Sequence, residues 1–245
     1  MAEVLSPVLI VGARAGIGRA LARAYAAEGC DLILAARGTD DLEDDRQDLE
    51  LRHNVSVSTA DYDVLTGDPD QFLASLGAVP GTMIMVVGLL GDPDLSLRED
   101  DEARAILETN FAGPARLMLA AARVMTKPGS TLIGIGSVAG DRGRGSNLVY
   151  GSAKAGFAAF LSGLRNKLQP SGVHVITVKP GFVRTPMTAG MKLPPLITAE
   201  PEAVAKAVVS AHKRGKNEIY VKLVWWPIMQ IIKAIPEPLF KRLKL

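Results

Sequence analysis

Three side chains near the middle of the chain combine a hydroxyl, a phenol and an ammonium group. Ser137 precedes Tyr150 and Lys154, which are four residues apart and would project from the same face of a helix. A cation beside a phenol favours the phenolate and lowers a pKa that is otherwise about 10. With a serine hydroxyl to hold a substrate oxygen, this phenol could exchange a proton with an oxygen whose charge changes, as in carbonyl reduction. Tyrosine and lysine at this spacing also occur on ordinary amphipathic helices, so other segments must support the interpretation.

The start of the chain predicts a phosphate-binding turn between a strand and a helix. An apolar segment, residues 7–11, leads into glycines at positions 12, 16 and 18, and an alanine-rich helical stretch follows. Glycines let the backbone approach a pyrophosphate, and the helix N-terminus supplies N–H groups and a positive dipole end. The alternative is a tight turn whose small residues serve helix packing. The context favours nucleotide binding, with expected contacts at Gly12, Gly16, Ile17 and Gly18.

Two arginines favour NADP(H) over NAD(H) as the nucleotide. The second apolar segment ends at Ala36, where an acidic residue usually meets the free ribose 2′-hydroxyl of NAD, and Arg37 follows. Arg14 lies inside the glycine turn. Two guanidinium groups would suit a 2′-phosphate, although either could simply face water.

Asp61 and Tyr62 follow a third predicted strand, at residues 55–60. The Asp61 carboxylate stands where an adenine amino group could be held, so both residues are expected cofactor contacts. The alternative for Asp61 is that it caps the N-terminus of the next helix.

Strand-like and helical segments alternate along the chain. The predicted strands cover residues 7–11, 31–36, 55–60, 82–87, 130–136, 173–178 and 218–221. The predicted helices cover residues 19–29, 39–52, 68–76, 97–111, 113–125, 147–168 and 199–212. This order predicts one α/β, doubly wound Rossmann-type domain, with a seven-stranded parallel sheet and helices on both faces. The catalytic domain is expected to span residues 1–221.

Composition excludes several classes of function. The 245 residues are 48% hydrophobic and 22% charged, and the net charge of +2 does not point to nucleic acid. No C-x-x-C pair or metal-spaced His/Cys cluster is present, so no metal site is expected. His53, His174 and His212 are expected to be structural. The N-terminus does not resemble a signal peptide, and no apolar run is long enough to span a bilayer, so we expect a cytoplasmic protein.

Two C-terminal segments are expected to shape the substrate site. Residues 182–198 contain prolines and apolar anchors with little periodicity, which predicts a mobile lid. Residues 222–245 contain two tryptophans, an apolar run and the basic residues Lys241, Arg242 and Lys244, and three prolines are expected to break this tail into short pieces. Such a tail suits peripheral contact with the cytoplasmic face of a membrane, or packing over the substrate cleft or a second subunit.

Taken together, these motifs resemble the short-chain dehydrogenase/reductase family over roughly residues 7–221. The glycine turn, a Pro180-Gly181 pair with Thr185, and a catalytic tetrad match the family in order, the tetrad being Asn110, Ser137, Tyr150 and Lys154. The resemblance implies that Tyr150 is the acid/base, that Ser137 orients the substrate oxygen and that Lys154 holds the ribose. It implies that Asn110 holds a relay water through its side chain or backbone; otherwise Asn110 is an ordinary polar helix residue. The resemblance also implies cofactor contacts at Gly88, Tyr150, Lys154, Pro180, Gly181, Val183 and Thr185.

One stretch departs from the family pattern. Where members commonly have N-N-A-G, this chain has Met85-Val86-Val87-Gly88, so only the glycine is kept. The following G-L-L-G-D, the S-x-A-G-D-R segment and the basic C-terminus are similar to a narrower group that includes decaprenylphosphoryl-2-ketoribose reductases. That similarity implies a lipid-like or lipid-linked keto-sugar substrate.

Three functions are compatible with these features. An NADP(H)-dependent carbonyl reductase or alcohol dehydrogenase is favoured by the intact tetrad. The alternatives are a catalytically silent nucleotide-sensing protein and a membrane-recruited interaction protein that works through its tail. The family resemblance implies a homodimer or homotetramer.

Overall fold

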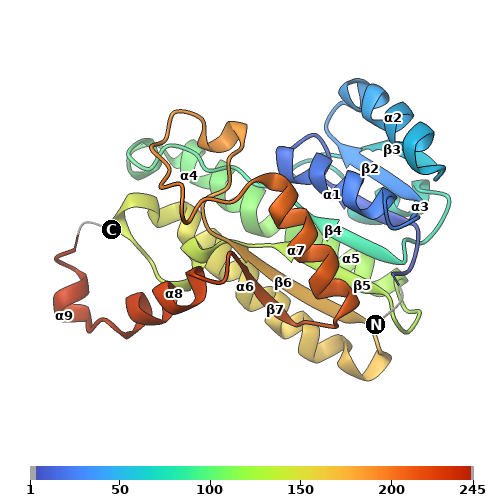
Figure 1. Cartoon of the computed structure of the whole chain (residues 1–245). Coiled ribbons are helices and arrows are strands. Elements are labelled where there is room, and N and C mark those ends of the chain that lie inside the picture. Colours follow the sequence, from blue (N-terminus) through green and yellow to red (C-terminus); the bar gives the residue numbers. More distant parts are fainter. Residues whose placement is uncertain (1–3, 244–245) are drawn as a thin grey trace.

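The computed structural model describes residues 4–243 and shows a parallel sheet between two layers of helices (Figure 1). The seven strands are β1 (Val8–Val11), β2 (Leu32–Ala36), β3 (Val57–Asp61), β4 (Thr82–Met85), β5 (Thr131–Ile135), β6 (His174–Pro180) and β7 (Glu218–Val221). Their order is β3-β2-β1-β4-β5-β6-β7, and all neighbours are parallel. The predicted fold is confirmed. The strand order reverses between β1 and β4, which is where ligands bind in open sheets of this kind.

The side chains of β1 show why both faces of the sheet are covered. Val8 and Ile10 join one apolar cluster, whereas Leu9 and Val11 join the other, because successive strand residues point to opposite faces. The first cluster is covered by α1 (Gly16–Ala26), α2 (Glu43–His53) and α7 (Pro201–Lys213). The second is covered by α3 (Pro69–Ser75), α5 (Gly113–Val124) and α6 (Leu148–Leu168). A further helix, α4 (Asp100–Leu107), precedes α5.

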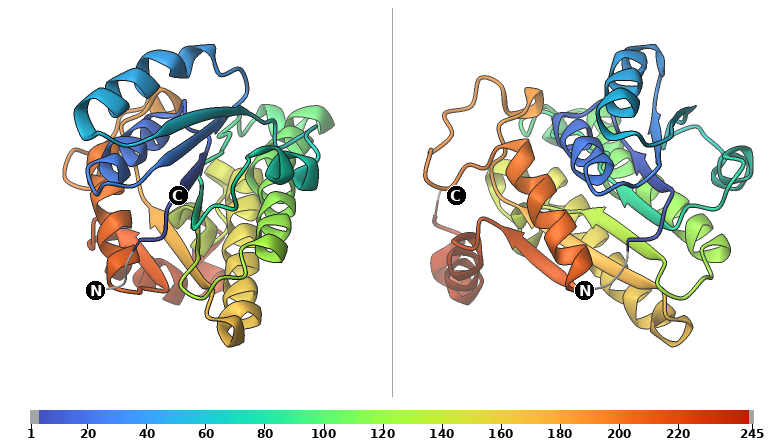
Figure 2. Two further views of the ribbon diagram at one scale, coloured as in Figure 1. Left: turned by 90° about the vertical axis from the view of Figure 1, so that its right-hand side faces the viewer. Right: turned by 45° about the vertical axis from the view of Figure 1, so that its right-hand side comes forward.

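Helices α1 and α7 lie side by side on the first face, although they come from opposite ends of the chain (Figure 2). The hydroxyl of Tyr25 lies 3.1 Å from Nδ1 of His212, and both side chains are buried. Arg23 donates to Glu202 at 2.9 Å along the same interface. Burial lowers the pKa of His212 to about 4, so this histidine is a neutral core residue.

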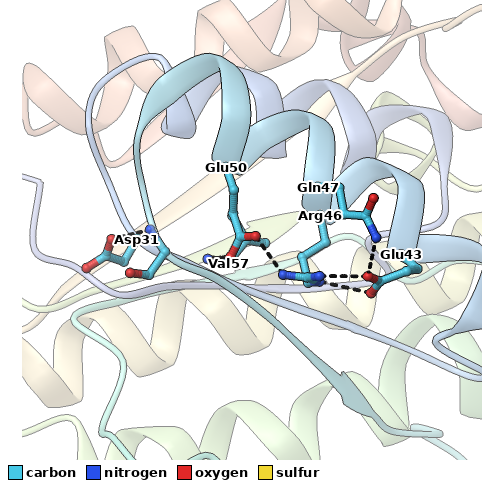
Figure 3. Close-up of polar contacts among 7 residues, drawn as sticks. Asp31, Glu43, Arg46, Gln47, Glu50 and Val57 are labelled. Atoms are coloured by element: carbon cyan, nitrogen blue, oxygen red, sulfur yellow. Dashed lines mark hydrogen bonds and ion pairs between the residues drawn. The ribbon is translucent and has the colours of Figure 1, made fainter.

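The charged helix α2 is tied to the sheet by its own carboxylates (Figure 3). Arg46 donates to Glu43 and Glu50, and Glu50 accepts a further hydrogen bond from the backbone N–H of Val57 at 3.1 Å. Asp31 accepts from the N–H of Ser56 at 2.8 Å. Glu50 of α2 and Asp31, which precedes β2, thus satisfy the backbone N–H groups of Val57 and Ser56 at the start of β3.

The C-terminal tail forms two helices, α8 (Trp225–Ala234) and α9 (Glu237–Phe240). The prediction that Pro227 breaks this segment is wrong, because Pro227 occupies the first turn of α8, where a backbone N–H has no helical partner. Pro236 follows the end of α8, and Lys244 lies outside the described residues. Within residues 4–243, no helix is both long and apolar enough to cross a membrane.

Candidate active site

The predicted site residues gather at the C-terminal edge of the sheet. The glycine turn follows β1, Gly88 follows β4, Ser137 follows β5 and Gly181 follows β6. Because the strands are parallel, these segments share one edge, and the early turns of α6 bring Tyr150 and Lys154 to it.

A tight turn holds Ser137 against α6. The turn, a 3-10 segment at Val138–Asp141, packs so closely that a Cβ on Gly140 would stand 2.7 Å from the backbone nitrogen of Ala155. On the other side of the contact, a Cβ on Gly151 would stand 3.0 Å from the carbonyl oxygen of Ala139. Both positions therefore require glycine, and the turn lies along the helix that carries Tyr150.

Lys154 is buried beneath the partly exposed Tyr150. Its ammonium donates to the carbonyl of Ile135 at 3.2 Å and lies 5.8 Å from the centre of the Tyr150 ring. Burial lowers the pKa of Lys154 to about 8. Burial also raises the pKa of Tyr150, and contact with Ser137 opposes this effect. The sequence predicted a lowered Tyr150 pKa; burial outweighs that effect here, because the ammonium is directed at a backbone carbonyl rather than at the phenol oxygen.

Asn110 lies in a five-residue π-helical segment, Glu108–Ala112, and is completely buried. Its amide donates to the carbonyls of Leu89 at 2.6 Å and Ile106 at 2.8 Å, and its oxygen accepts from the N–H of Leu89 at 3.2 Å. The side chain is therefore occupied in holding the loop after β4. A water held by Asn110 would therefore have to be bound by its backbone rather than by its side chain. Segments of π-helix often mark functional sites.

Gly88 separates Asn110 from Lys154. A Cβ at this position would lie 3.2 Å from the Asn110 side-chain oxygen and 3.5 Å from the Lys154 ammonium nitrogen. Asn110 is thereby brought close to Lys154, with only Gly88 between them. A side chain at position 88 would crowd both groups, which explains a glycine here although the asparagines of the family pattern are absent.

The glycine turn fits the phosphates of a dinucleotide. Gly12 has φ +95°, and a Cβ there would lie 3.1 Å from the backbone nitrogen of Val87. A Cβ on Gly18 would overlap the carbonyl of Gly12. A Cβ on Gly16 would stand 3.6 Å from Thr185, so the turn opens toward that threonine. Ile17 is partly buried against the first apolar cluster.

The adenosine end of the expected cofactor site contains both predicted arginines. Arg14 donates to the backbone carbonyl of Arg37 at 2.6 Å and pairs with Asp41. The Arg37 side chain is 72% exposed, and its guanidinium lies 3.9 Å from Asp63. The two guanidinium groups thus lie at the end of β2, where they were predicted to meet a 2′-phosphate.

At the end of β3, the side chains of Asp61 and Tyr62, the two expected cofactor contacts, are already engaged within the protein. The carboxylate of Asp61 accepts a hydrogen bond from the N–H of Gly38 at 2.8 Å. The Tyr62 ring is buried against Phe72, with ring centres 4.2 Å apart. Any contact of Tyr62 with a cofactor is therefore left to its backbone.

The predicted lid, residues 182–198, is closed at its base by pairing between Val183 and Ala199. The N–H of Ala199 donates to Phe182 at 2.8 Å, and the N–H of Arg184 donates back to Ala199 at 2.9 Å. Thr185 begins a short 3-10 segment next to the glycine turn. Pro180 ends β6, and Gly181 has no room for a side chain because a Cβ would overlap the Trp225 indole.

Sequence reasoning missed a buried charge cluster that supports the turn after Ser137. Lys179 contacts Asp141 at 2.9 Å and Glu218 at 3.0 Å, and Tyr220 donates to the other oxygen of Asp141 at 2.6 Å. These hydrogen bonds raise the pKa of Lys179 against the opposite effect of burial. The partners are far apart in the sequence and come from β6, β7 and the turn, so no local spacing could reveal them.

Arg142 docks the tail onto this same turn. Its guanidinium donates to the backbone carbonyls of Ile232 and Ile235 at 2.6 Å and of Lys233 at 3.1 Å. It also contacts Glu237 at 2.9 Å and lies 3.6 Å from the centre of the Phe240 ring. A cation at the C-terminal end of α8 also complements the helix dipole. Of the two arrangements expected for the tail, packing on the protein is therefore present.

Trp225 forms the second anchor of the tail. It is buried against Phe182, with ring centres 5.5 Å apart, and its indole N–H donates to the carbonyl of Ile197 at 3.0 Å. Together with Met229 and Val138, it forms a small apolar cluster beside Ser137. The tail thus links the catalytic turn to both ends of the lid.

Within residues 4–243, no group of three or more His, Cys, Asp or Glu residues could hold a metal ion. The arrangement instead places a hydroxyl, a phenol and a buried ammonium group beside a glycine-rich turn, at the switch point of a doubly wound sheet. This combination is typical of nucleotide-dependent oxidoreductases.

Comparison with known proteins places the chain in a family. The family model described as short chain dehydrogenase matches residues 6–194. An uncharacterized oxidoreductase of Mycobacterium tuberculosis is 36% identical, with 97% of each chain covered. Another, from Streptomyces coelicolor, is 33% identical over 96% of this chain and 95% of its own length. The chain belongs to the short-chain dehydrogenase family, and it is an NAD(P)-dependent oxidoreductase of that family.

Solved structures support the same fold. A short-chain dehydrogenase from Sphingobium yanoikuyae in complex with NADPH is 23% identical, with a TM-score of 0.79, and covers 95% of this chain and 97% of its own. A short chain dehydrogenase from Burkholderia cenocepacia in complex with NADP is also 23% identical, with a TM-score of 0.81 and 97% of each chain covered.

The Arg142 contacts generate a prediction about the tail. Arg142→Ala should release α8 from the catalytic turn, because three accepting backbone carbonyls and one carboxylate lose their donor. Amide hydrogen exchange in residues 225–234 should accelerate at least about tenfold, while β1 and β5 stay protected. The matched control, Arg98→Ala, removes an exposed arginine elsewhere and should leave α8 unchanged. Equal protection of α8 in both variants would contradict the role of Arg142 in holding α8 on the turn after Ser137.

Proposed function

We propose that the chain is an NADP(H)-dependent carbonyl reductase in which Tyr150 is the acid/base. The observation that carries the proposal is the grouping of Ser137, Tyr150 and Lys154 beside the glycine cradle, at one edge of the sheet. The bound nicotinamide would supply or accept the hydride. Tyr150 would hold and transfer the proton at the substrate oxygen, Ser137 would orient that oxygen, and Lys154 would hold the ribose.

The proposed substrate is lipid-like, or a keto-sugar linked to a lipid. The lid exposes Met187 and Met191, and Leu196 at its far end is 89% exposed. Methionine adapts to irregular apolar shapes, which suits a flexible hydrocarbon chain. Trp225 and Met229 add an apolar wall beside Ser137. These surfaces support a substrate that has an apolar portion next to its reacting carbonyl.

The preference for NADP(H) rests on Arg14 and Arg37. Both lie at the end of β2, where position 36 holds an alanine and not the acidic residue that usually meets the ribose of NAD. The solved structures do not decide the question, since the Sphingobium yanoikuyae protein is in complex with NADPH and a reductase from Brucella melitensis is in complex with NAD.

A second proposal concerns peripheral membrane contact through the tail. The outer side of α8 and its flanks presents Leu223 and Trp226, which are 82% and 56% exposed, and Ile231, which is 67% exposed. Basic residues accompany them at positions 222, 233, 241 and 242. Aromatic and aliphatic side chains beside lysines and arginines suit an anionic bilayer surface. A homodimer or homotetramer, with residues 1–221 as the catalytic domain, stays a prediction.

Replacing Tyr150 with phenylalanine tests the catalytic assignment. Turnover of ketones and keto-sugars, followed by NADPH consumption, should fall by roughly 10²–10⁴-fold, because the proton donor is lost. The dissociation constant for NADPH should stay within about twofold. The control Tyr25→Phe removes a core hydroxyl far from the site and should keep turnover. An unchanged rate in Tyr150→Phe would contradict the proposal, and NADPH binding with no turnover in the native protein would favour a nucleotide sensor.

Replacing Arg37 with alanine tests the cofactor preference. Loss of one charge-assisted contact should weaken NADPH binding by at least about tenfold and leave NADH binding within about twofold. Calorimetric titration of both nucleotides into both proteins measures this difference. Arg116→Ala, at an exposed site on α5, is the matched control. An equal loss for NADPH and NADH would remove the 2′-phosphate role.

The membrane proposal calls for point substitutions rather than truncation. Removing the whole tail would take away the buried Trp225 and Met229, uncover Val138 and Phe182, and disturb the turn after Ser137. Leu223→Ser with Trp226→Ser should weaken flotation with phosphatidylglycerol vesicles by at least about tenfold, because two large apolar side chains are lost. The control Leu51→Ser changes an 87% exposed leucine on α2. Equal flotation of all three proteins would contradict membrane contact through this face.

A further inference from the structure

Two polar side-chain atoms in the loop between Ser137 and Tyr150 are buried without a partner. They are Nε of Arg144 and Oδ1 of Asn147. Leaving a buried polar atom unpaired destabilises the fold, and the penalty is larger for a charged group. Two such atoms within four residues of one another, in the segment that leads to the proposed acid/base, call for an explanation.

Arg144 contrasts with Arg142, two residues earlier. The guanidinium of Arg142 is engaged with α8, Glu237 and Phe240. Among the described residues, Arg144 makes no ion pair and donates no side-chain hydrogen bond, although burial is sufficient to lower the pKa of its guanidinium. The arrangement of Arg142 is that of a structural arginine, whereas the donors of Arg144 remain available.

The nearby carboxylate does not account for Arg144. Asp141 acts on the guanidinium through space, but both of its oxygens are already bound. One contacts the ammonium of Lys179 at 2.9 Å, and the other accepts from Tyr220 at 2.6 Å. Both oxygens of Asp141 are therefore occupied by partners other than Arg144.

Both residues belong to the loop that leads from Ser137 into the helix of Tyr150. Arg144 precedes a 3-10 turn, Gly145–Asn147, and its carbonyl accepts from the N–H of Asn147 at 3.2 Å. Asn147 is the residue before α6, so Tyr150 follows within the first turn of that helix. The Asn147 oxygen makes no capping hydrogen bond and lies 3.1 Å from the place of a Cβ on Gly151, next to Tyr150.

We propose that Arg144 and Asn147 form a substrate subsite for an oxyanion group, such as a phosphate, with a neighbouring hydroxyl. The planar guanidinium would donate paired hydrogen bonds to the oxyanion, a geometry that arginine provides and lysine does not. The Asn147 oxygen would accept from the hydroxyl. This inference rests on the proposed function, because it assigns the group to the carbonyl substrate. The same chemistry is found in a free sugar phosphate and in a sugar linked to a lipid through phosphate.

Calorimetry on the full-length protein, saturated with the nucleotide that it binds more tightly, tests the subsite. Saturation blocks the phosphate sites of the glycine cradle. The probes are glycerol phosphate and octyl phosphate, with glycerol as the neutral comparison. The native protein should bind at least one phosphate more tightly than glycerol. Preference for glycerol phosphate indicates a free phosphorylated substrate, and preference for octyl phosphate indicates a lipid-linked one.

Variants identify the residues responsible. Arg144→Gln should weaken phosphate binding by at least about tenfold, Arg144→Lys should retain part of it, and Asn147→Ala should weaken glycerol phosphate binding several-fold. The control Arg214→Gln replaces an exposed arginine at the C-terminal end of α7 and should leave phosphate binding unchanged. Arg144→Lys keeps the charge, so it reports on binding even where the glutamine variant folds poorly.

Two results would overturn the subsite: phosphate affinity that Arg144 substitutions leave unchanged, or native protein that binds neither phosphate more tightly than glycerol. Tyr150→Phe keeps the tests separate, because it should retain phosphate binding while losing turnover. Arg144-dependent binding together with Tyr150-independent turnover would reject the catalytic assignment and leave the anion subsite standing.

Discussion

The close approach of the turn after β5 to helix α6 is the constraint on which the rest of the site depends. Glycines at 140 and 151 remove the side chains that would hold the two segments apart, and the backbone of the turn then rests on the helix. Ser137 is thereby held beside the helix that carries Tyr150 and Lys154. The same turn continues into Asp141, Arg142 and Arg144, so one backbone contact positions catalysis, the buried charge cluster, the tail and the proposed anion subsite.

The tail packs against the turn after β5 and the ends of the 182–198 segment, even though its composition resembles a membrane-surface segment. Its inner side provides Trp225 and Met229 to a cluster beside Ser137, and its outer side exposes Leu223, Trp226 and Ile231. A helix with two apolar sides can contact the protein and a lipid surface at once. That arrangement would bring the lid and the acid/base close to a substrate whose apolar part stays in a bilayer.

Polar groups at the two ends of the site are treated differently. At the nucleotide end, Arg14 and Arg37 are exposed and paired with carboxylates, so an incoming 2′-phosphate would exchange one partner for another at modest cost. At the substrate end, Arg144 and Asn147 have buried atoms with no partner. Binding energy from a matching group is greater at such a site, and selectivity against substrates that lack the group is correspondingly stronger.

The sequence by itself determined the fold and most of the proposed site, because both depend on short-range patterns. An unbroken apolar run such as Val8–Val11 predicts a strand that is covered on both faces of the sheet, and the spacing of Tyr150 and Lys154 predicts their common face on one helix. The parallel order then places the glycine turn, Gly88 and Ser137 at one edge.

Only the tertiary structure decided which polar groups find partners. Lys179 meets Asp141 and Glu218 because the turn after β5 lies next to β6 and β7, and Asn110 is occupied by the backbone around Gly88. Pro227 was expected to break the tail, but it lies in the first turn of α8, where its missing N–H costs no helical hydrogen bond. The availability of Arg144 beside the engaged Arg142 could not be inferred from two arginines in one loop, because partners supplied by distant segments decide whether a charge is satisfied.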